Sequence, residues 1–210
     1  VDTLLKDNNK LADYRIVGVI SYKEDQSVIE QICDKYGLAK STYEESLVKC
    51  DVVLILDNYR NYSDEKYYEV IQNAWDLGKE IILTPYAAVQ LDLSGFDGKY
   101  KILKKETWNS EDIDIHYDVS KKDRIYDSDI PVIGVMGQGK DCGKFECQKL
   151  IENVLKKECK LTLLSSNPLG ALYGYYTMPD FMYDSIPFYE KVFKFNYYIR
   201  TIVKKENPDV

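Results

Sequence analysis

Apolar runs of the strand type alternate with helical patterns through the N-terminal half of this chain. The runs cover residues 14–21, 51–57 and 80–84, and each is rich in β-branched residues. Helical patterns at 26–36 and 63–78 separate them. Buried strands that alternate with helices are typical of parallel sheets whose strands are joined by right-handed crossovers. The sequence therefore predicts an α/β fold that begins with a Rossmann-like parallel sheet.

Capping signals mark the ends of these predicted helices. Gly37 follows the first helix, a Ser41-x-x-Glu44 capping box begins a short second helix, and Ser63 precedes the third. No G-x-G-x-x-G fingerprint of a dinucleotide-binding domain follows the run that ends at Ser21. Either an earlier strand carried it, or this domain, residues 1–105, binds no dinucleotide; we favour the second interpretation.

Charged residues crowd the stretch that follows this domain. Residues 106–129 lack apolar periodicity, apart from an alternating piece at 113–117 that we interpret as an edge strand. We therefore predict a linker here, followed by a second domain over residues 130–210. The single histidine, His116, lies in the linker and is interpreted as exposed and without a role.

The composition excludes several classes of partner. The 210 residues include 28 basic and 35 acidic side chains, a net charge of −7, so we expect no nucleic acid partner. Leu161–Pro179 is uncharged but contains Pro168 and Gly170, so we interpret it as a strand and loop and expect no membrane partner. The five cysteines are scattered without a C-x-x-C pair, and no secretory signal begins the chain. These features predict a cytoplasmic protein with reduced thiols.

The second domain begins with the pattern of a phosphate-binding loop (P-loop). A predicted strand at 131–136, a glycine-rich loop, a helical pattern at 147–155 and a second predicted strand at 160–165 follow one another. Glycines let backbone N–H groups turn inward around an anion, and the helix N-terminus adds partial positive charge. A lysine in the loop adds a mobile cation. The candidate residues for binding a phosphate or a nucleotide are Gly137, Gly139, Lys140, Asp141, Cys142, Gly143, Lys144 and Phe145.

The spacing of the loop glycines points to a particular kind of P-loop protein. Gly137 and Gly143 are six positions apart, one more than in the common G-x-x-x-x-G-K-[ST] form. This longer loop resembles that of dethiobiotin-synthetase-like and cobyric-acid-synthase-like proteins, and residues 167–169 resemble the Lys-Pro-Val of such synthetases. Phe145 departs from the family, which has at this position the Ser or Thr that holds Mg²⁺. The resemblance implies ATP or GTP as ligand, and Phe145 argues against Mg²⁺.

A second resemblance covers more of the chain. Residues 130–139, 142–145 and 166–170 together resemble a clostridial family of peptide-maturation proteins from natural-product gene clusters. That family pairs a Rossmann-like N-terminal region with a C-terminal P-loop region. The resemblance implies a role in the maturation of a ribosomally made peptide, with a peptide or other maturation proteins as partners. The alternative is a non-catalytic scaffold or partner-binding protein with a degenerate P-loop, and catalysis stays open.

Two further residues near the loop are candidates with competing interpretations. Cys142 lies beside a predicted helix N-terminus and two lysines, which would lower its thiol pKa, although a small loop filler is the favoured interpretation. Asp180 follows the second predicted strand, where a carboxylate could hold Mg²⁺; a solvated loop acid is the alternative.

The C-terminal part of the chain predicts a long amphipathic helix over residues 185–205. Its two apolar stripes are Phe188, Val192, Phe195, Ile199 and Ile202, and Tyr189, Phe193 and Tyr197. The predicted strands 131–136 and 160–165 are too few for a stable buried sheet. We therefore expect the P-loop domain to be incomplete at its C-terminus and the chain to be a portion of a longer protein.

Overall fold

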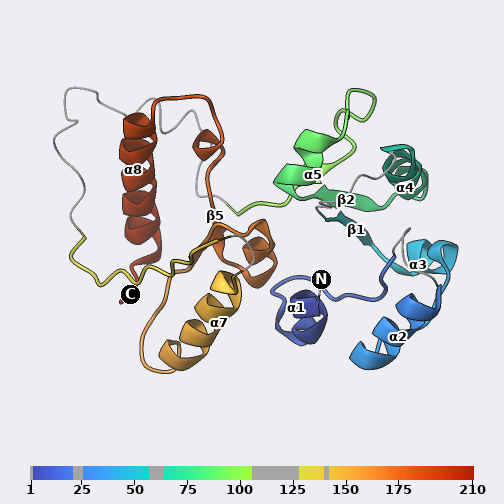
Figure 1. The fold of residues 1–210 in the computed structure, drawn as a ribbon, viewed down its shortest axis with the longest axis horizontal. Helices are drawn as coiled ribbons and strands as arrows, with labels where there is room; N and C mark the ends of the chain where they lie inside the picture. Colours follow the sequence, from blue (N-terminus) through green and yellow to red (C-terminus); the bar gives the residue numbers. More distant parts are fainter. Residues whose placement is uncertain (1, 21–25, 57–63, 106–127, 140–141) are drawn as a thin grey trace. The chain divides into compact units, whose positions relative to one another are not determined.

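The chain forms two compact units. The computed structural model describes residues 2–20, 26–56, 64–105, 128–139 and 142–210. Unit 1 comprises Val1–Lys104 together with Leu172–Gly174, and unit 2 comprises Lys105–Ala171 and Tyr175–Val210 (Figure 1). The division lies beside residue 105, where we placed the end of the first domain. Residues 106–127 of the predicted linker, with His116 and the predicted edge strand, lie outside the described residues.

A parallel three-stranded sheet forms the centre of unit 1. Its strands are β1 (Val52–Ile55), β2 (Glu80–Leu83) and β3 (Lys101–Ile102), in the spatial order β1-β2-β3. Helix α4 (Asp64–Asp76) connects β1 to β2, and α5 (Pro85–Gln90) lies between β2 and β3 in the sequence. This arrangement confirms the predicted α/β class with parallel strands.

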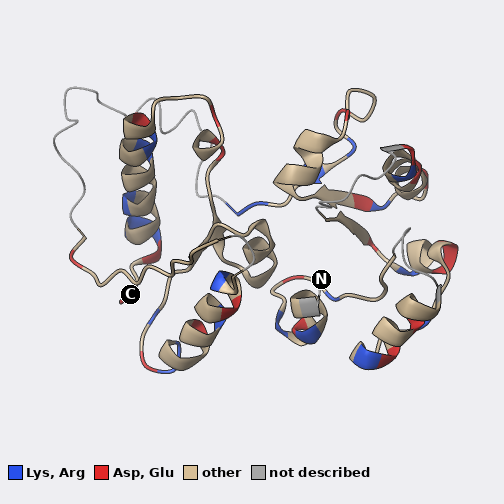
Figure 2. Cartoon of the chain, in the orientation of Figure 1, with Lys and Arg blue, Asp and Glu red and all other residues tan. Residues whose placement is uncertain are grey.

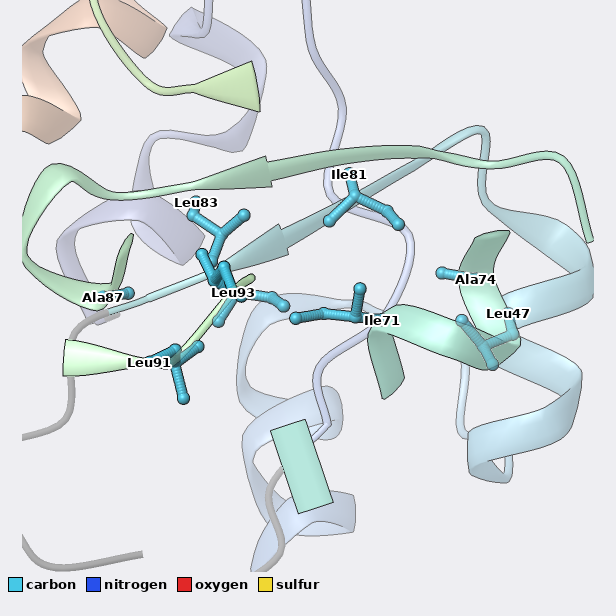
Figure 3. Packing of buried hydrophobic residues seen from close by; sticks show 9 residues of the cluster. Leu47, Ile71, Ala74, Ile81, Leu83, Ala87, Leu91 and Leu93 are labelled. Atoms are coloured by element: carbon cyan, nitrogen blue, oxygen red, sulfur yellow. The ribbon is translucent and has the colours of Figure 1, made fainter. Parts of the chain in front are cut away.

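Apolar side chains from the sheet and its helices make the core of unit 1. Ile71 and Ala74 of α4 and Leu83 of β2 belong to one hydrophobic cluster, and all three are completely buried (Figure 3). Burial of each large aliphatic side chain contributes about 1.5–3 kcal/mol. The full cluster is Leu47, Ile55, Ile71, Ala74, Ile81, Leu83, Ala87, Leu91 and Leu93.

Among the described residues, four helical segments precede the sheet. They are α1 (Asp2–Lys6), η1 (Asn8–Lys10), α2 (Gln26–Tyr36) and α3 (Tyr43–Lys49). Helix α2 ends before Gly37, whose φ of 65° is in the left-handed region that glycine tolerates.

The capping box of α3 lies one residue later than predicted. Thr42 Oγ1 accepts from the Glu45 N–H at 3.2 Å, and Glu45 Oε2 accepts from the Thr42 N–H at 3.2 Å. The Ser41 hydroxyl instead bonds the Ser46 hydroxyl at 3.0 Å. The predicted Ser41–Glu44 box is therefore wrong, because Ser41 precedes the N-cap and its side chain is used elsewhere.

The predicted strand at 14–21 does not form over its described part, residues 14–20. The backbone of Ile16 is bonded to a side chain instead of a neighbouring strand. Its N–H donates to Asn8 Oδ1 at 2.6 Å, and Asn8 Nδ2 donates to the Ile16 carbonyl at 2.9 Å. The amide of Asn8 thus satisfies both backbone groups of Ile16 that a sheet partner would have satisfied.

Unit 2 combines helices with a small parallel sheet. Helix α7 (Lys144–Leu155) precedes β4 (Leu164–Ser165), which pairs in parallel with β5 (Tyr176–Thr177). The long helix α8 (Phe188–Glu206) follows. The described part of unit 2 also contains the 3-10 helices η3 (Pro168–Tyr173) and η4 (Asp180–Met182), and its buried cluster is Tyr176, Phe181, Tyr198 and Ile202.

The predicted strand at 131–136 is absent from unit 2, and the one at 160–165 is reduced to β4. A strand forms only when its backbone meets a partner, and β4 pairs with β5. Val132 and Ile133 are 68% and 51% exposed. The backbone before β4 bonds the last residues of the chain, since the Thr162 N–H donates to the Val210 carbonyl at 3.0 Å.

The buried face of α8 differs from the two predicted stripes. Tyr198, which belongs to neither stripe, is completely buried and donates to the Thr177 carbonyl at 3.0 Å. Ile202 is buried with it, but Phe188 and Val192 of the same predicted stripe are 81% and 40% exposed. Among the described residues, the core of unit 2 meets α8 at Tyr198 and Ile202, in the later turns of the helix, and not at Phe188 near its start.

Charged residues of both signs lie along the helices of each unit (Figure 2). None of the helices among the described residues has both the length and the apolar character that crossing a bilayer requires.

Candidate phosphate-binding site

The predicted loop leads directly into the first turn of α7. Gly143 is the N-cap, with φ 76° and ψ 17°, a left-handed conformation that favours glycine. The Cys147 N–H donates to the Gly143 carbonyl at 2.9 Å, so the helix begins at Lys144, earlier than its apolar pattern indicated. The Gly-Lys pair of the motif is thus at a helix N-terminus, where backbone dipoles favour an anion.

The Lys144 side chain folds back over the loop. Its ammonium donates to the Gly139 carbonyl at 2.6 Å and to Cys142 Sγ at 3.3 Å. A cation is therefore held beside the loop backbone, at the end of the helix that carries partial positive charge. The sequence indicated the lysine but gave no sign of these two acceptors.

Gly137 is closely approached by two loop side chains. A Cβ at this position would lie 2.2 Å from Cys142 Sγ and 3.0 Å from Lys144 Cγ. At Gly139, none of the described residues has an atom within 4 Å of the corresponding position. Gly137 is therefore required by the packing of the loop in this conformation, whereas the described neighbours of Gly139 leave room for a side chain.

Cys142 is exposed and polarised by its neighbours. Its thiol lies 3.1 Å from the Gly139 carbonyl oxygen. Hydrogen bonding with the Gly139 backbone, and then with the Lys144 ammonium, lowers the thiol pKa. The direction of this shift agrees with the prediction. Lys140 and Asp141, the other two candidates in the loop, lie outside the described residues.

Phe145 lies on the buried side of the first helical turn. It is 9% exposed and meets Tyr175 edge-on, with ring centroids 6.0 Å apart and planes at 62°. The Lys149 ammonium lies 5.7 Å from the centroid of the Phe145 ring. The Tyr175 hydroxyl donates to Glu152, which lies about two turns after Phe145 on the same helix. A ring packed in this way offers no oxygen to a hard cation.

The segment that resembles the synthetase Lys-Pro-Val has a local structural role. Asn167 Oδ1 accepts from the Leu169 N–H at 3.0 Å, which is an Asx turn at the start of η3. The Asn167 N–H donates to Ser165 Oγ at 3.1 Å. A Cβ on Gly170 would lie 2.8 Å from Ser165 Cβ, so the backbone of η3 passes close to β4.

A residue that the sequence did not indicate connects α7 to the sheet. Gln148 Nε2 donates to the Leu164 carbonyl at 2.9 Å. It lies one turn after Lys144, so it fixes the helix that carries the candidate lysine against β4. Its position in a mostly polar stretch gave no signal of this contact.

Asp180, the candidate Mg²⁺ ligand, is exposed and is the first residue of η4. Figure 1 shows this short helix beside the N-terminal half of α8, well away from the first turn of α7. Within the described part of the chain, no group of three or more His, Cys, Asp or Glu residues could hold a metal ion. The structure therefore does not bring Asp180 together with the candidate loop.

Comparison of the chain with protein-family models, with curated proteins and with solved structures gives no match.

Proposed function

We propose that residues 137–144 bind a phosphate-bearing anion, and that a nucleotide such as ATP or GTP is the ligand. The supporting observation is that Gly143, in a left-handed conformation, begins α7 immediately before Lys144. The helix N-terminus and a lysine ammonium beside the loop are the two features that attract phosphate oxygens. The peptide-maturation role and its peptide or protein partners are proposed on the sequence resemblance of residues 130–139, 142–145 and 166–170.

We further propose that the loop binds its ligand without rapid turnover. In Mg²⁺-dependent P-loop proteins a hydroxyl directly after the lysine holds the metal ion. Here the corresponding side chain is Phe145, which is buried against Tyr175. Because Phe145 stands in place of that hydroxyl, we expect the loop to bind a nucleotide without hydrolysing it rapidly.

A partner-binding protein with a degenerate loop is the second candidate. The observation that favours it is the apolar exposure before the loop, where Val132, Ile133 and Met136 are 68%, 51% and 92% exposed. Contiguous exposed apolar side chains are typical of surfaces that another molecule covers. This candidate predicts that the loop binds no nucleotide.

Calorimetric titration of ATP, GTP and pyrophosphate, each with and without Mg²⁺, tests the choice. Lys144→Ala should weaken binding by about tenfold to a hundredfold, because a charge-assisted hydrogen bond contributes about 1.5–3 kcal/mol. Lys157→Ala is the matched control: it removes the same charge just beyond the other end of α7, and its affinity should equal that of the wild type. Equal affinity in Lys144→Ala would remove the loop from consideration, and absence of binding to the wild type would favour the partner-binding candidate.

A further inference from the structure

A lysine ammonium lies over two aromatic rings in unit 1. Lys99 Nζ is 5.5 Å from the centroid of the Trp75 ring and 5.3 Å from that of the Phe96 ring. Trp75 is in the last turn of α4, and the other two residues belong to the segment between α5 and β3. Both distances are within the range of about 6 Å over which a ring face attracts a cation. These three residues are called the ring platform below.

Backbone turns and ring stacking hold the ring platform in place. The Phe96 N–H donates to the Leu93 carbonyl at 2.8 Å, and the Lys99 N–H donates to the Phe96 carbonyl at 2.9 Å, so two consecutive turns fix this segment. The Phe96 ring also stacks on that of Tyr68 in α4, with centroids 5.7 Å apart and planes at 12°. A surface that is ordered before binding loses less conformational entropy when a partner covers it.

The charge of Lys99 is not neutralised by an acidic neighbour. Asp76 Oδ1 accepts from Gln72 Nε2 at 2.7 Å, and Glu80 Oε1 accepts from Lys101 Nζ at 2.8 Å. The exposed Asp97 belongs to the same segment as Lys99 but makes no ion pair with it. Across the described ranges of the chain, no carboxylate pairs with the Lys99 ammonium. An anionic group of another molecule can therefore approach it without displacing an acid of this chain.

Apolar surface and a second donor lie beside this ammonium. Trp75 is 44% exposed, and none of the described residues accepts a hydrogen bond from its indole N–H. Leu77, which directly follows α4 after Asp76, is 50% exposed. The surface thus presents an ammonium and an N–H donor next to exposed apolar side chains. A single small anion would satisfy the donors and leave the apolar side chains in water.

We propose that the ring platform docks an acidic, apolar peptide segment of a partner protein. A carboxylate of that segment accepts from Lys99, and a neighbouring aliphatic side chain packs on the exposed part of Trp75. Lys99 determines the charge of the partner, and the indole determines its apolar character. Tryptophan is among the residues that contribute most to binding at protein interfaces. The proposal concerns unit 1 and is independent of the candidate phosphate-binding loop in unit 2.

Fluorescence anisotropy with labelled synthetic peptides tests this docking surface on the intact chain. The probe is a short peptide in which glutamate and leucine alternate, and peptides with lysine or glutamine in place of glutamate are its controls. The wild type should bind the glutamate peptide more tightly than either control. Lys99→Gln should weaken this binding by about threefold to tenfold, and Trp75→Ala by about tenfold or more. Urea denaturation checks that each variant is folded.

Lys35→Gln is the matched control variant. Lys35 is an exposed lysine of α2 whose ammonium lies 4.8 Å from the centroid of one ring, that of Tyr36. Its substitution removes the same charge and the same kind of ring contact outside the ring platform, so affinity for the glutamate peptide should equal that of the wild type. Lys99→Glu, which reverses the charge on the ring platform, should instead favour the lysine peptide.

Three results would overturn the proposal. The first is equal binding of the glutamate and glutamine peptides by the wild type, or no binding of either. The second is an unchanged affinity in Lys99→Gln. The third is a dimer of the wild type, seen by analytical ultracentrifugation, that Trp75→Ala abolishes, because this would assign the surface to a second copy of the chain.

Discussion

The ring of Phe145 meets the ring of Tyr175 edge-on, with centroids 6.0 Å apart. Phe145 belongs to the first turn of α7, and Tyr175 directly precedes β5. The contact therefore attaches the end of the helix that carries Lys144 to the sheet of unit 2. Aromatic pairs in this geometry contribute about 0.5–1.5 kcal/mol beyond the burial of their surface.

Removal of this ring should destabilise unit 2. Phe145→Ala should lower the free energy of unfolding by about 2–4 kcal/mol, because it leaves a cavity and removes the aromatic contact. Phe188→Ala is the matched control, since Phe188 is 81% exposed and its truncation should cost little. Urea denaturation followed by circular dichroism measures both. A loss below about 1 kcal/mol in Phe145→Ala would contradict the structural role of the ring.

Nucleotide binding by the wild type should depend weakly on Mg²⁺. Phe145 supplies no oxygen ligand where a Ser or Thr hydroxyl would hold the ion. Phe145→Thr should increase the Mg²⁺ dependence of binding, provided that the variant folds. Phosphate release and affinity are measured for both proteins across a Mg²⁺ series. Robust Mg²⁺-dependent turnover by the wild type would show that the metal is held by another route.

The side chain of Asn8 should contribute measurably to the stability of unit 1. It bonds both backbone groups of Ile16, at 2.6 Å and 2.9 Å. Asn8→Ala leaves these partly buried groups without the amide and should cost about 1–3 kcal/mol. The exposed neighbour Asn9 serves as control, because Asn9→Ala removes the same amide from the same 3-10 helix. Similar urea midpoints for the two variants would contradict the role assigned to Asn8.

The hydrogen bond from Tyr176 to Glu206 should make stability depend on pH. This bond, followed by the nearby ammonium groups, lowers the pKa of Glu206, while burial acts in the opposite direction. A carboxyl group whose pKa is lower in the folded state stabilises the protein above its unfolded pKa, which is about 4.3. That contribution is lost as the pH falls through the folded pKa.

Comparison of the wild type with Tyr176→Phe measures this effect. The difference in unfolding free energy should be largest near pH 7 and should shrink as the pH falls below about 4. In a Glu206→Gln background, the same substitution should give a difference that no longer varies over this range. If the difference in unfolding free energy between the wild type and Tyr176→Phe instead grew toward low pH, the stabilising role of the bond from Tyr176 to Glu206 would be contradicted.

The elements that were predicted correctly depend on residues that lie close together in the sequence. Helix α2 ends where Gly37 predicts, and β1 and β2 flank α4 as the apolar runs indicate. The start of α3 was misplaced by one residue because Ser41 and Thr42 are adjacent and chemically alike; Thr42 caps the helix, and the Ser41 hydroxyl bonds Ser46. Local sequence thus determines the type of an element better than its boundary.

The strands that were predicted wrongly depend on distant partners. Residues 14–20 and 131–136 have strand-like sequences, but a strand needs a neighbouring backbone, and no local pattern states which segment will provide it. At Ile16 the partner is the side chain of Asn8. Tyr198 was missed for the same reason, because its burial depends on contacts with Phe181 and Tyr176, which lie in other elements.

Within the candidate site, the sequence indicated the residue types and missed their contacts. The glycine before the helix and the lysine that begins it are where the motif predicts, while the ring of Phe145 stands where the motif has a hydroxyl. The acceptors of the Lys144 ammonium depend on the direction of the Gly139 carbonyl, which glycine leaves undetermined. The turn at Asn167 follows from its own side chain, which accepts a hydrogen bond from the Leu169 N–H.

Residues 172–174 belong to unit 1 although the chain on both sides of them belongs to unit 2. The Leu172 carbonyl accepts from the Ala12 N–H at 2.9 Å, and the Tyr173 hydroxyl donates to Asp7 at 3.4 Å. A gene fragment that stops at residue 104 would lack the Leu172 carbonyl and the Tyr173 hydroxyl. A fragment that starts at residue 105 would contain residues 172–174 without Ala12 and Asp7, to which they bond. Expression of either unit from one continuous gene fragment would therefore remove these hydrogen bonds. Substitutions in the intact chain keep them and are the better way to study each unit.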